Sequence, residues 1–266
     1  MTADSLSFYQ AMTERRSVRG FLDKPVPQAE LEAIFSLAQH APSNCNIQPW
    51  QVWVASGETR NALRERLVDK VSRGVPFAPD YESLPRFQGV YRERQVDCAM
   101  ALYGNMGIAR EDREGRRRAE LRNFELFDAP HVAFIGMERD FGVTVALDVG
   151  MYVQSLLLAM TAHGVGACAQ GSMRYYPDDV RELLGIPDST AIVLGISFGY
   201  ENADVAANRT RVGQAVSRIC AIIPAGPPMP WRQNWLLPAG LTTIAIISIR
   251  YRHFLKLNFM NSRGKA

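Results

Sequence analysis

The chain has 266 residues, 47% of them hydrophobic and 21% charged, which suffices for one substantial core and is typical of a globular protein. The formal charge of +3 is unevenly distributed, because no Asp or Glu follows Asp204 whereas nine Lys or Arg do. Residues 1–204 therefore carry 21 basic and 27 acidic side chains, a net charge of −6, which argues against a nucleic-acid partner.

Cysteine and histidine usage narrows the class further. The four cysteines lack CxxC spacing, which favours reduced thiols over a disulfide scaffold. The four histidines are scattered singly, without the i, i+4 pairing of a helical metal site, so no metal ligands are expected. The first residues lack the basic start and apolar run of a signal peptide, and we expect a cytoplasmic protein.

Two helices are predicted at the start of the chain. Residues 4–16 are expected to form a helix capped by Asp4 or Ser5. Its apolar side comprises Leu6, Phe8, Tyr9 and Met12. A second helix is expected between Pro27 and Pro42. Its buried stripe is predicted to comprise Leu31, Ile34, Phe35 and Leu37.

Residues 50–122 alternate between strand, helix and loop signals. The β-branched and aromatic residues of 50–56 (WQVWVAS) predict a strand, and 57–74 predict a surface helix. Residues 76–88 show no clear period and suggest a loop or lid. Residues 89–122 are predicted to be mostly helical and are rich in arginine.

A buried strand is predicted at residues 131–137 (HVAFIGM), followed by a long apolar segment. Residues 143–164 contain about 18 nearly apolar residues, enough to raise the alternative of a membrane span. Asp148, Gln154 and His163, together with two glycines, favour a central buried helix instead.

The last regular segments complete the expected architecture. Residues 164–172 (GVGACAQGS) suggest a small-residue turn or strand, 175–187 a short capped helix, and 189–200 a core strand. Helices interleaved with few strands predict an α+β sandwich around a small sheet. A Rossmann fold and a P-loop are disfavoured, because neither GxGxxG after a strand nor GxxxxGK[ST] occurs.

Two cationic groups suit an anionic ligand. The first follows the N-terminal helix and comprises Arg15, Arg16, Ser17 and Arg19. Arginine offers paired planar donors to phosphate oxygens, although a solvated charge run at a helix end would look the same. The second is Arg209 and Arg211, alternate residues that would face the same way in an extended segment.

Two further segments are rich in short or small residues. The stretch 41–50 (APSNCNIQPW) holds four hydrogen-bonding side chains between two prolines, more than a self-contained turn requires. In 164–172, the small residues would let backbone N–H groups approach a flat ring closely.

These segments, in the order RRSVRGF, APSNCNIQPWQ, GVGACAQGS, YYPDDVRELLGIP, VLGISFGY and NRTR, resemble the FMN-dependent nitroreductase family. The resemblance runs from about residue 8 to about residue 214. It implies an α+β homodimer with a small, mostly antiparallel central sheet flanked by helices, FMN at the subunit interface, and NAD(P)H as reductant. We therefore expect an FMN-binding domain at 1–214 and an atypical basic and apolar tail at 215–266.

The resemblance also implies the roles of individual residues. The ribityl phosphate and part of the flavin edge would be held by Arg15, Arg16, Ser17, Arg19, Arg209 and Arg211 of one subunit. The partner subunit would contribute Pro42, Ser43, Asn44 and Asn46. Backbone donors near the flavin N5 would come from Gly171 and Ser172, with Gln170 beside them. No catalytic side chain is expected, because the flavin itself carries the hydride.

The implied reaction is ping-pong reduction of nitroaromatic or quinone-like acceptors. Alternatives are a related flavin reductase acting on enones or on flavin itself, and a flavin-binding regulator without turnover. The arginines of 110–122 either line an acceptor pocket that favours carboxylated nitroaromatics or form a solvated helix face. Contact between the tail and an anionic membrane surface is a further alternative.

Overall fold

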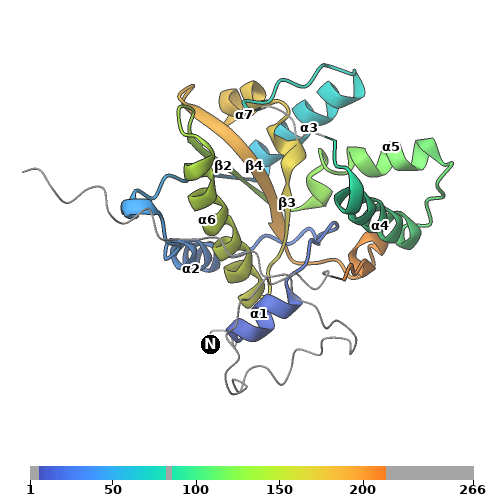
Figure 1. The fold of residues 1–266 in the computed structure, drawn as a ribbon, viewed down its shortest axis with the longest axis horizontal. Coiled ribbons are helices and arrows are strands. Elements are labelled where there is room, and N and C mark those ends of the chain that lie inside the picture. The colour runs from blue at the N-terminus through green and yellow to red at the C-terminus, as the bar shows by residue number, and fades with distance from the viewer. Residues whose placement is uncertain (1–5, 82–85, 214–266) are drawn as a thin grey trace, which may run out of the picture. The chain divides into compact units, whose positions relative to one another are not determined.

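A four-stranded antiparallel sheet lies at the centre of the computed structural model, which describes residues 6–81 and 86–213 (Figure 1). The strands are β1 (Gln51–Ser56), β2 (His131–Glu138), β3 (Gly166–Gln170) and β4 (Thr190–Gly199). Their order across the sheet is β1-β2-β4-β3, and every neighbouring pair is antiparallel. The predicted tail lies outside the described residues, so the boundary at residue 214 stays a prediction.

Seven α-helices occur in the described part of the chain. They are α1 (Phe8–Glu14), α2 (Gln28–Ala38), α3 (Gly57–Ser72), α4 (Gly89–Asn105), α5 (Arg113–Leu121), α6 (Val143–Ala162) and α7 (Pro177–Leu184). Short 3-10 turns include η1 (Asn44–Asn46), η3 (Gly171–Arg174) and η4 (Ala206–Arg209). These elements match the predicted helices and strands, and the described part of 76–88 contains neither.

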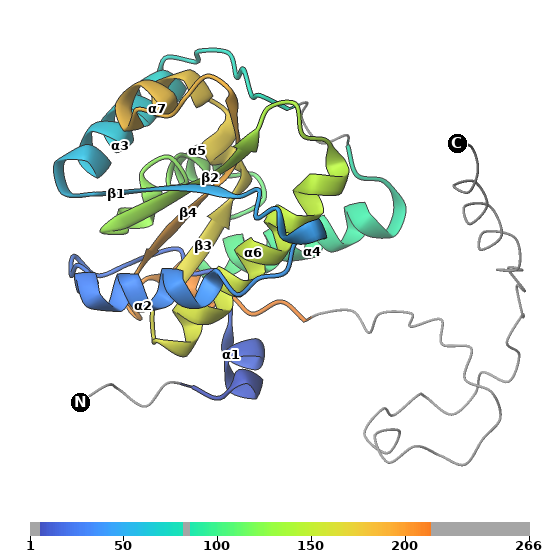
Figure 2. The ribbon, with the colours of Figure 1, turned by 90° about the vertical axis from the view of Figure 1, so that its left-hand side faces the viewer.

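The sheet is covered on both faces, because successive side chains of a strand point in opposite directions. On one face Ala133 and Ile135 of β2 share a core with α2 and α6 (Figure 2). On the other face Val132 and Phe134 pack with α3 and α7. The expected α+β sandwich around a small antiparallel sheet is therefore confirmed.

The N-terminal helix differs from the expectation at its start. Its cap is Ser7, not Asp4 or Ser5. The Ser7 Oγ accepts the backbone N–H of Gln10 at 3.3 Å, and the Gln10 Oε1 accepts the N–H of Ser7 at 3.0 Å. This reciprocal capping box satisfies two backbone donors at once, which explains why the helix begins here.

Two helices expose apolar side chains. On α1, Phe8 and Tyr9 are each 76% exposed. On α2, Leu31 and Ile34 are buried as predicted, but Leu37 is 50% exposed. Leu37 lies outside the buried stripe because Ala38, one position later, occupies the core-facing side of the last turn.

The long helix α6 is buried on one side only. Its buried residues are Asp148, Val149, Tyr152, Leu156, Leu157, Ala159 and Met160. By contrast, Val143 is 80% exposed and Leu147 66% exposed, so the predicted central helix packs into the core on one side and is open on the other in the single chain. Among the described helices α6 alone is long and apolar enough to cross a membrane, yet it packs against α1, α2 and β3.

Candidate functional site

The first cationic segment runs beside the edge strand β3. The backbone N–H of Val18 donates to the Ala167 carbonyl at 3.0 Å, and Ser17 forms a parallel bridge with Ala167. Val18 is buried, so the alternation of an extended chain turns Ser17 and Arg19 to the opposite side. Residues 15–19 therefore form a strand-like segment that presents polar side chains along the sheet edge.

Asn208 joins this segment to the second cationic segment. Its Oδ1 accepts the N–H of Arg19 at 2.6 Å across 189 residues of sequence. Its Nδ2 donates to the carbonyls of Gly20 at 2.8 Å and Asn202 at 2.9 Å. A Cβ on Gly20 would lie 2.5 Å from the Val205 side chain, so only glycine permits this approach. The backbones of the two predicted phosphate-binding segments thus meet.

The arginines of these segments point in different directions. The Arg16 guanidinium pairs with Glu201. Arg211 donates through Nη1 to the Asn208 carbonyl at 2.7 Å and to the Thr210 carbonyl at 2.9 Å. Arg15 is half-buried and Arg209 is exposed. The structure therefore brings the segments together at their backbones, while Arg16 faces Glu201, a residue that the sequence pattern did not single out.

The C-terminal end of β3 carries the third predicted group. Gln170 is buried, its Oε1 accepts from the Ser197 hydroxyl at 2.5 Å, and its Nε2 donates to the Asn123 carbonyl at 2.9 Å. Its amide is thus occupied by protein groups. Gly171 is exposed, and the Ser172 hydroxyl oxygen is buried without a hydrogen-bond partner among the described residues. Such an orphaned polar atom suits a ligand.

The predicted partner-subunit loop lies elsewhere. Pro42, Asn44 and Asn46 are exposed and Ser43 is half-buried, in the turn between α2 and β1 that lies against α6 (Figure 2). The Ser43 Oγ accepts the N–H of Gln48 at 2.9 Å. Figure 1 shows this turn beyond α6, whereas η4 lies beside α4 on the other side of the sheet. A single chain does not bring the two groups together.

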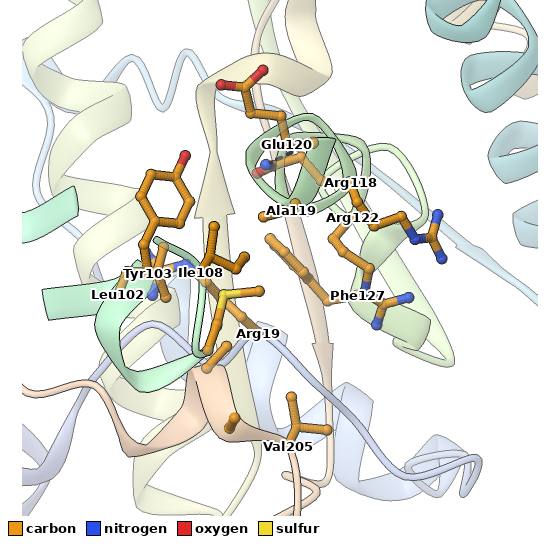
Figure 3. Close-up of a pocket in the computed structure, with 15 residues that line it drawn as sticks. Arg19, Leu102, Tyr103, Ile108, Arg118, Ala119, Glu120, Arg122, Phe127 and Val205 are labelled. Carbon is orange, nitrogen blue, oxygen red and sulfur yellow. Dashed lines mark hydrogen bonds between the residues drawn. The ribbon is translucent and has the colours of Figure 1, made fainter. Parts of the chain in front are cut away.

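A cavity of about 380 Å³ opens between α4, α5 and η4 (Figure 3). Its lining is mostly apolar and includes Leu102, Met106, Ile108, Phe127 and Val205. Arg19 lines it as well, which places the cavity beside the first cationic segment. Asn123, the partner of Gln170, also belongs to the lining and links the cavity to the end of β3.

Two arginines of the arginine-rich stretch, Arg118 and Arg122, line this cavity, and both form ion pairs with neighbouring carboxylates. Arg118 pairs with Glu125, and Arg122 contacts Glu125 at 2.7 Å and Asp128 at 2.5 Å. Burial alone would raise the pKa of Glu125, yet hydrogen bonds from Arg122 and Arg118 hold that pKa below its usual value. An ionised Glu125 therefore offsets the positive charge at this wall. The described residues include no group of three or more potential metal ligands.

Fold and site together define a class: an α+β sandwich with a cationic edge site beside an apolar cavity. Residues 12–200 match the sequence model of the nitroreductase family. This chain therefore belongs to the nitroreductase family, which confirms the resemblance seen in its motifs.

Individual relatives agree with this assignment. Nitroreductase NfnB of Mycolicibacterium smegmatis is 40% identical over 206 residues, 76% of this chain and 86% of that protein. A 4-nitrobenzoate reductase of Nocardioides sp. is 36% identical over 203 residues, 74% of this chain and 82% of that protein. The crystal structure of the FMN-dependent nitroreductase NfnB from Mycobacterium smegmatis in complex with NADPH superposes with a TM-score of 0.75 at 38% identity, covering 78% of this chain and 93% of that chain.

Proposed function

We propose that this chain is an FMN-dependent NAD(P)H oxidoreductase that reduces nitroaromatic or quinone-like acceptors. Membership of the family and the FMN and NADPH named for its 38% identical structural relative support this function. When bound, FMN would supply hydride transfer from NAD(P)H to the acceptor in two alternating, ping-pong half-reactions. A cytoplasmic location is part of the same proposal.

The observation that carries the proposal is the junction of two cationic segments at the edge of β3. Asn208 fixes the backbone of Arg19 there, and the chain that follows the same strand carries an orphaned hydroxyl on Ser172. These groups fit a ligand that joins a phosphate to a polar ring. The phosphate is assigned to Arg15, Arg16, Ser17, Arg19, Arg209 and Arg211. Arg16 would reach it only by leaving Glu201.

The remaining site residues would act on the ring. Backbone N–H groups of Gly171 and Ser172, beside the buried Gln170, would donate hydrogen bonds to negative charge that develops on the ring during reduction. Cationic Arg19 would stabilise the same charge and lines the cavity that accepts the second substrate. The apolar walls of this cavity suit a flat aromatic acceptor.

A homodimer completes the proposed site. The exposed apolar side chains on α1 (Phe8 and Tyr9) and on the first turns of α6 (Val143 and Leu147) would be available to a second copy. In such a dimer Pro42, Ser43, Asn44 and Asn46 of the partner subunit would reach the flavin, which one chain alone does not allow.

Anaerobic reduction tests the function directly. The purified protein should be yellow, should bleach when NADPH is added without oxygen, and should regain its colour on addition of a nitroaromatic or a quinone. A yellow protein that never bleaches would identify a flavin-binding regulator. Recovery with an enone or with free flavin alone would identify the related reductases.

Removal of single arginines tests the phosphate assignment. Arg15→Ala and Arg209→Ala should each weaken FMN binding by about tenfold or more, because each change removes a charge-assisted contact. Gel filtration followed by the absorbance of the protein peak measures FMN retention. Arg73→Ala is the matched control, since Arg73 is an exposed arginine that pairs with Asp69 on α3. Retention equal to that of the control would refute the assignment.

A further inference from the structure

The turn after α2 holds a backbone conformation that its residues rarely adopt. Cys45, Asn46 and Gln48 have φ values of 49°, 57° and 46°, in the left-handed region. Residues with a Cβ enter this region at a cost, Asn less than others, and they stay there only when surrounding contacts enforce it. The Ser43–Gln48 hydrogen bond holds the turn from within, and because most of the turn is exposed, its few links to the core supply the other enforcing contacts.

One of these links is a buried carboxylate. Asp148 of α6 is only 5% exposed, and its Oδ2 accepts the backbone N–H of Asn44 at 3.0 Å. A buried carboxylate requires hydrogen-bond donors to replace water. The hydrogen bond therefore stabilises the Asp148 carboxylate and also holds the backbone of Asn44 in place. It fixes the first residue of η1, where the turn enters its left-handed stretch.

The end of the turn is fixed from the same side of α6. Tyr152, one helical turn after Asp148, stacks on Trp50 with ring centroids 4.8 Å apart. The Trp50 Nε1–H donates to Gln39 Oε1 at 2.9 Å, which ties the exit of the turn to the end of α2. Asp148 and Tyr152 thus hold the entrance and the exit of one turn from a single face of one helix.

We propose that Asp148 is a positioning residue for FMN binding, which holds Ser43, Asn44 and Asn46 in the conformation that meets the flavin of the partner subunit. This inference rests on the proposed function. Asp148 itself does not touch the flavin. Without its carboxylate the turn relaxes toward unstrained conformations, and the apparent affinity for FMN falls with the fraction of molecules that keep the competent one.

A graded pair of substitutions tests this role. Asp148→Ala removes the acceptor and should raise the Kd of FMN about tenfold, whereas Asp148→Asn keeps a neutral acceptor and should fall between wild type and alanine. The Kd is measured from the rise in flavin fluorescence as holoenzyme is diluted. Hydrogen exchange of the peptide covering 42–48 should quicken in the same order, which a general loss of stability would not confine to this turn.

Asp179→Asn is the matched control. Asp179 is also a buried carboxylate, but it lies on α7 and pairs with Lys70 at 2.9 Å and Arg66 at 3.1 Å on the other face of the sheet. The Asp179→Asn substitution should lower the midpoint temperature of thermal unfolding, while the Kd of FMN stays within about twofold of wild type. An equal rise in Kd in this control would overturn the proposal, because any buried charge would then have the same effect.

Ser43→Ala separates failure of this inference from failure of the proposed function. If Ser43→Ala releases FMN while both Asp148 variants retain it, the turn binds the flavin but Asp148 does not position it. If Ser43→Ala retains FMN as well, the turn is not part of the site, and both assignments fall. The phosphate assignment would still stand on Arg15→Ala and Arg209→Ala.

Discussion

A single amide side chain holds the two halves of the proposed phosphate site together. Asn208 is buried and uses its oxygen on Arg19 and its nitrogen on Gly20 and Asn202. Among side chains only the carboxamides of asparagine and glutamine combine an acceptor oxygen with two N–H donors, and asparagine holds the group one methylene closer to its backbone. Asn208 is uncharged and would not itself bind a phosphate, but it holds together the two segments that carry the cationic side chains.

Asn208→Ala should lower the free energy of unfolding by about 1–3 kcal/mol, because it leaves buried backbone groups without partners. FMN retention should fall as well, since residues 15–19 lose their tie to the second cationic segment. Urea unfolding and gel filtration measure the two effects. Asn61→Ala, at an exposed asparagine on α3 whose Oδ1 accepts from the neighbouring Arg60, is the control and should change neither. A loss no larger than that of the control would contradict this role.

His131 makes stability depend on pH at the start of β2. Its Nε2 accepts the N–H of Val26 at 2.9 Å and its Nδ1 lies 2.5 Å from the Ser56 hydroxyl, contacts that the neutral ring makes. Burial, and secondarily the charge of Arg60, lowers its pKa. The unfolded chain therefore binds a proton at a pH where the folded protein does not, and stability is lost as the pH falls.

The free energy of unfolding should decline as the pH drops below about 6.5, the usual pKa of histidine. In His131→Gln this decline should flatten, although the variant is less stable at neutral pH. Urea titrations at several pH values give the slopes. His40→Gln, at an exposed position, should keep the wild-type slope. If His131→Gln keeps it too, another group causes the decline.

At the scale of elements, a buried ion-pair cluster around Asp80 holds the segment that follows α3 against the sheet. Asp80, in the segment that leads to α4, accepts from Arg181 at 2.8 Å, from Arg139 at 2.8 Å and from the N–H of Ile192 at 2.8 Å. The carboxylate of Asp80 and the guanidinium of Arg181 are both buried. This cluster attaches the described residues around Asp80 to α7 and β4.

Asp80→Ala should cost about 3–5 kcal/mol of unfolding free energy, because it removes the buried carboxylate partner of the buried Arg181 and leaves that guanidinium paired only with the exposed Asp178. Chemical denaturation measures the loss. Asp69→Ala breaks an exposed i, i+4 pair with Arg73 and should cost no more than about 0.5 kcal/mol. Similar losses in both variants would mean that the Asp80 cluster is no stronger than a surface pair.

At the scale of the whole molecule, the proposed site requires the proposed dimer, because one chain does not bring residues 42–46 to the cationic segments. The apolar residues exposed on α1 and α6 are what a second copy would cover, and the turn held by Asp148 lies beside α6. Association and FMN binding should therefore be coupled, since each subunit completes the site of the other.

Leu147→Glu should shift the protein from dimer to monomer in analytical ultracentrifugation and should release FMN, because it places a charge in the proposed interface. The fold of the single chain should persist, since Leu147 is 66% exposed there. Leu22→Glu, also at an exposed leucine, is the control and should leave both properties unchanged. A Leu147→Glu protein that stays dimeric would place the interface elsewhere.

Local patterns carried most of the element assignments. The strand at Gln51–Ser56 and the helix at Gln28–Ala38 were predictable because alternation and turn-forming residues act within a few positions. The partners of Arg16 and Gln170 were not predictable, because Glu201 and Asn123 are distant in the sequence and no local pattern links them. The predicted burial of Leu37 was wrong for a related reason. Burial depends on which side of each helical turn faces the core, and in the last turn of α2 that side is occupied by Ala38.

The sequence by itself determined the family, the α+β class, the order of the elements and the segments that carry cationic and amide groups, because these depend on residue type and short-range spacing. Only the tertiary structure decided which of these side chains are bonded to other protein groups and which are free to bind a ligand. It paired Arg16 with Glu201, buried Gln170 against Ser197, and gave Asn208 and Asp148 their roles as ties. Such pairings are long-range contacts, formed only when packing brings distant segments within hydrogen-bonding distance.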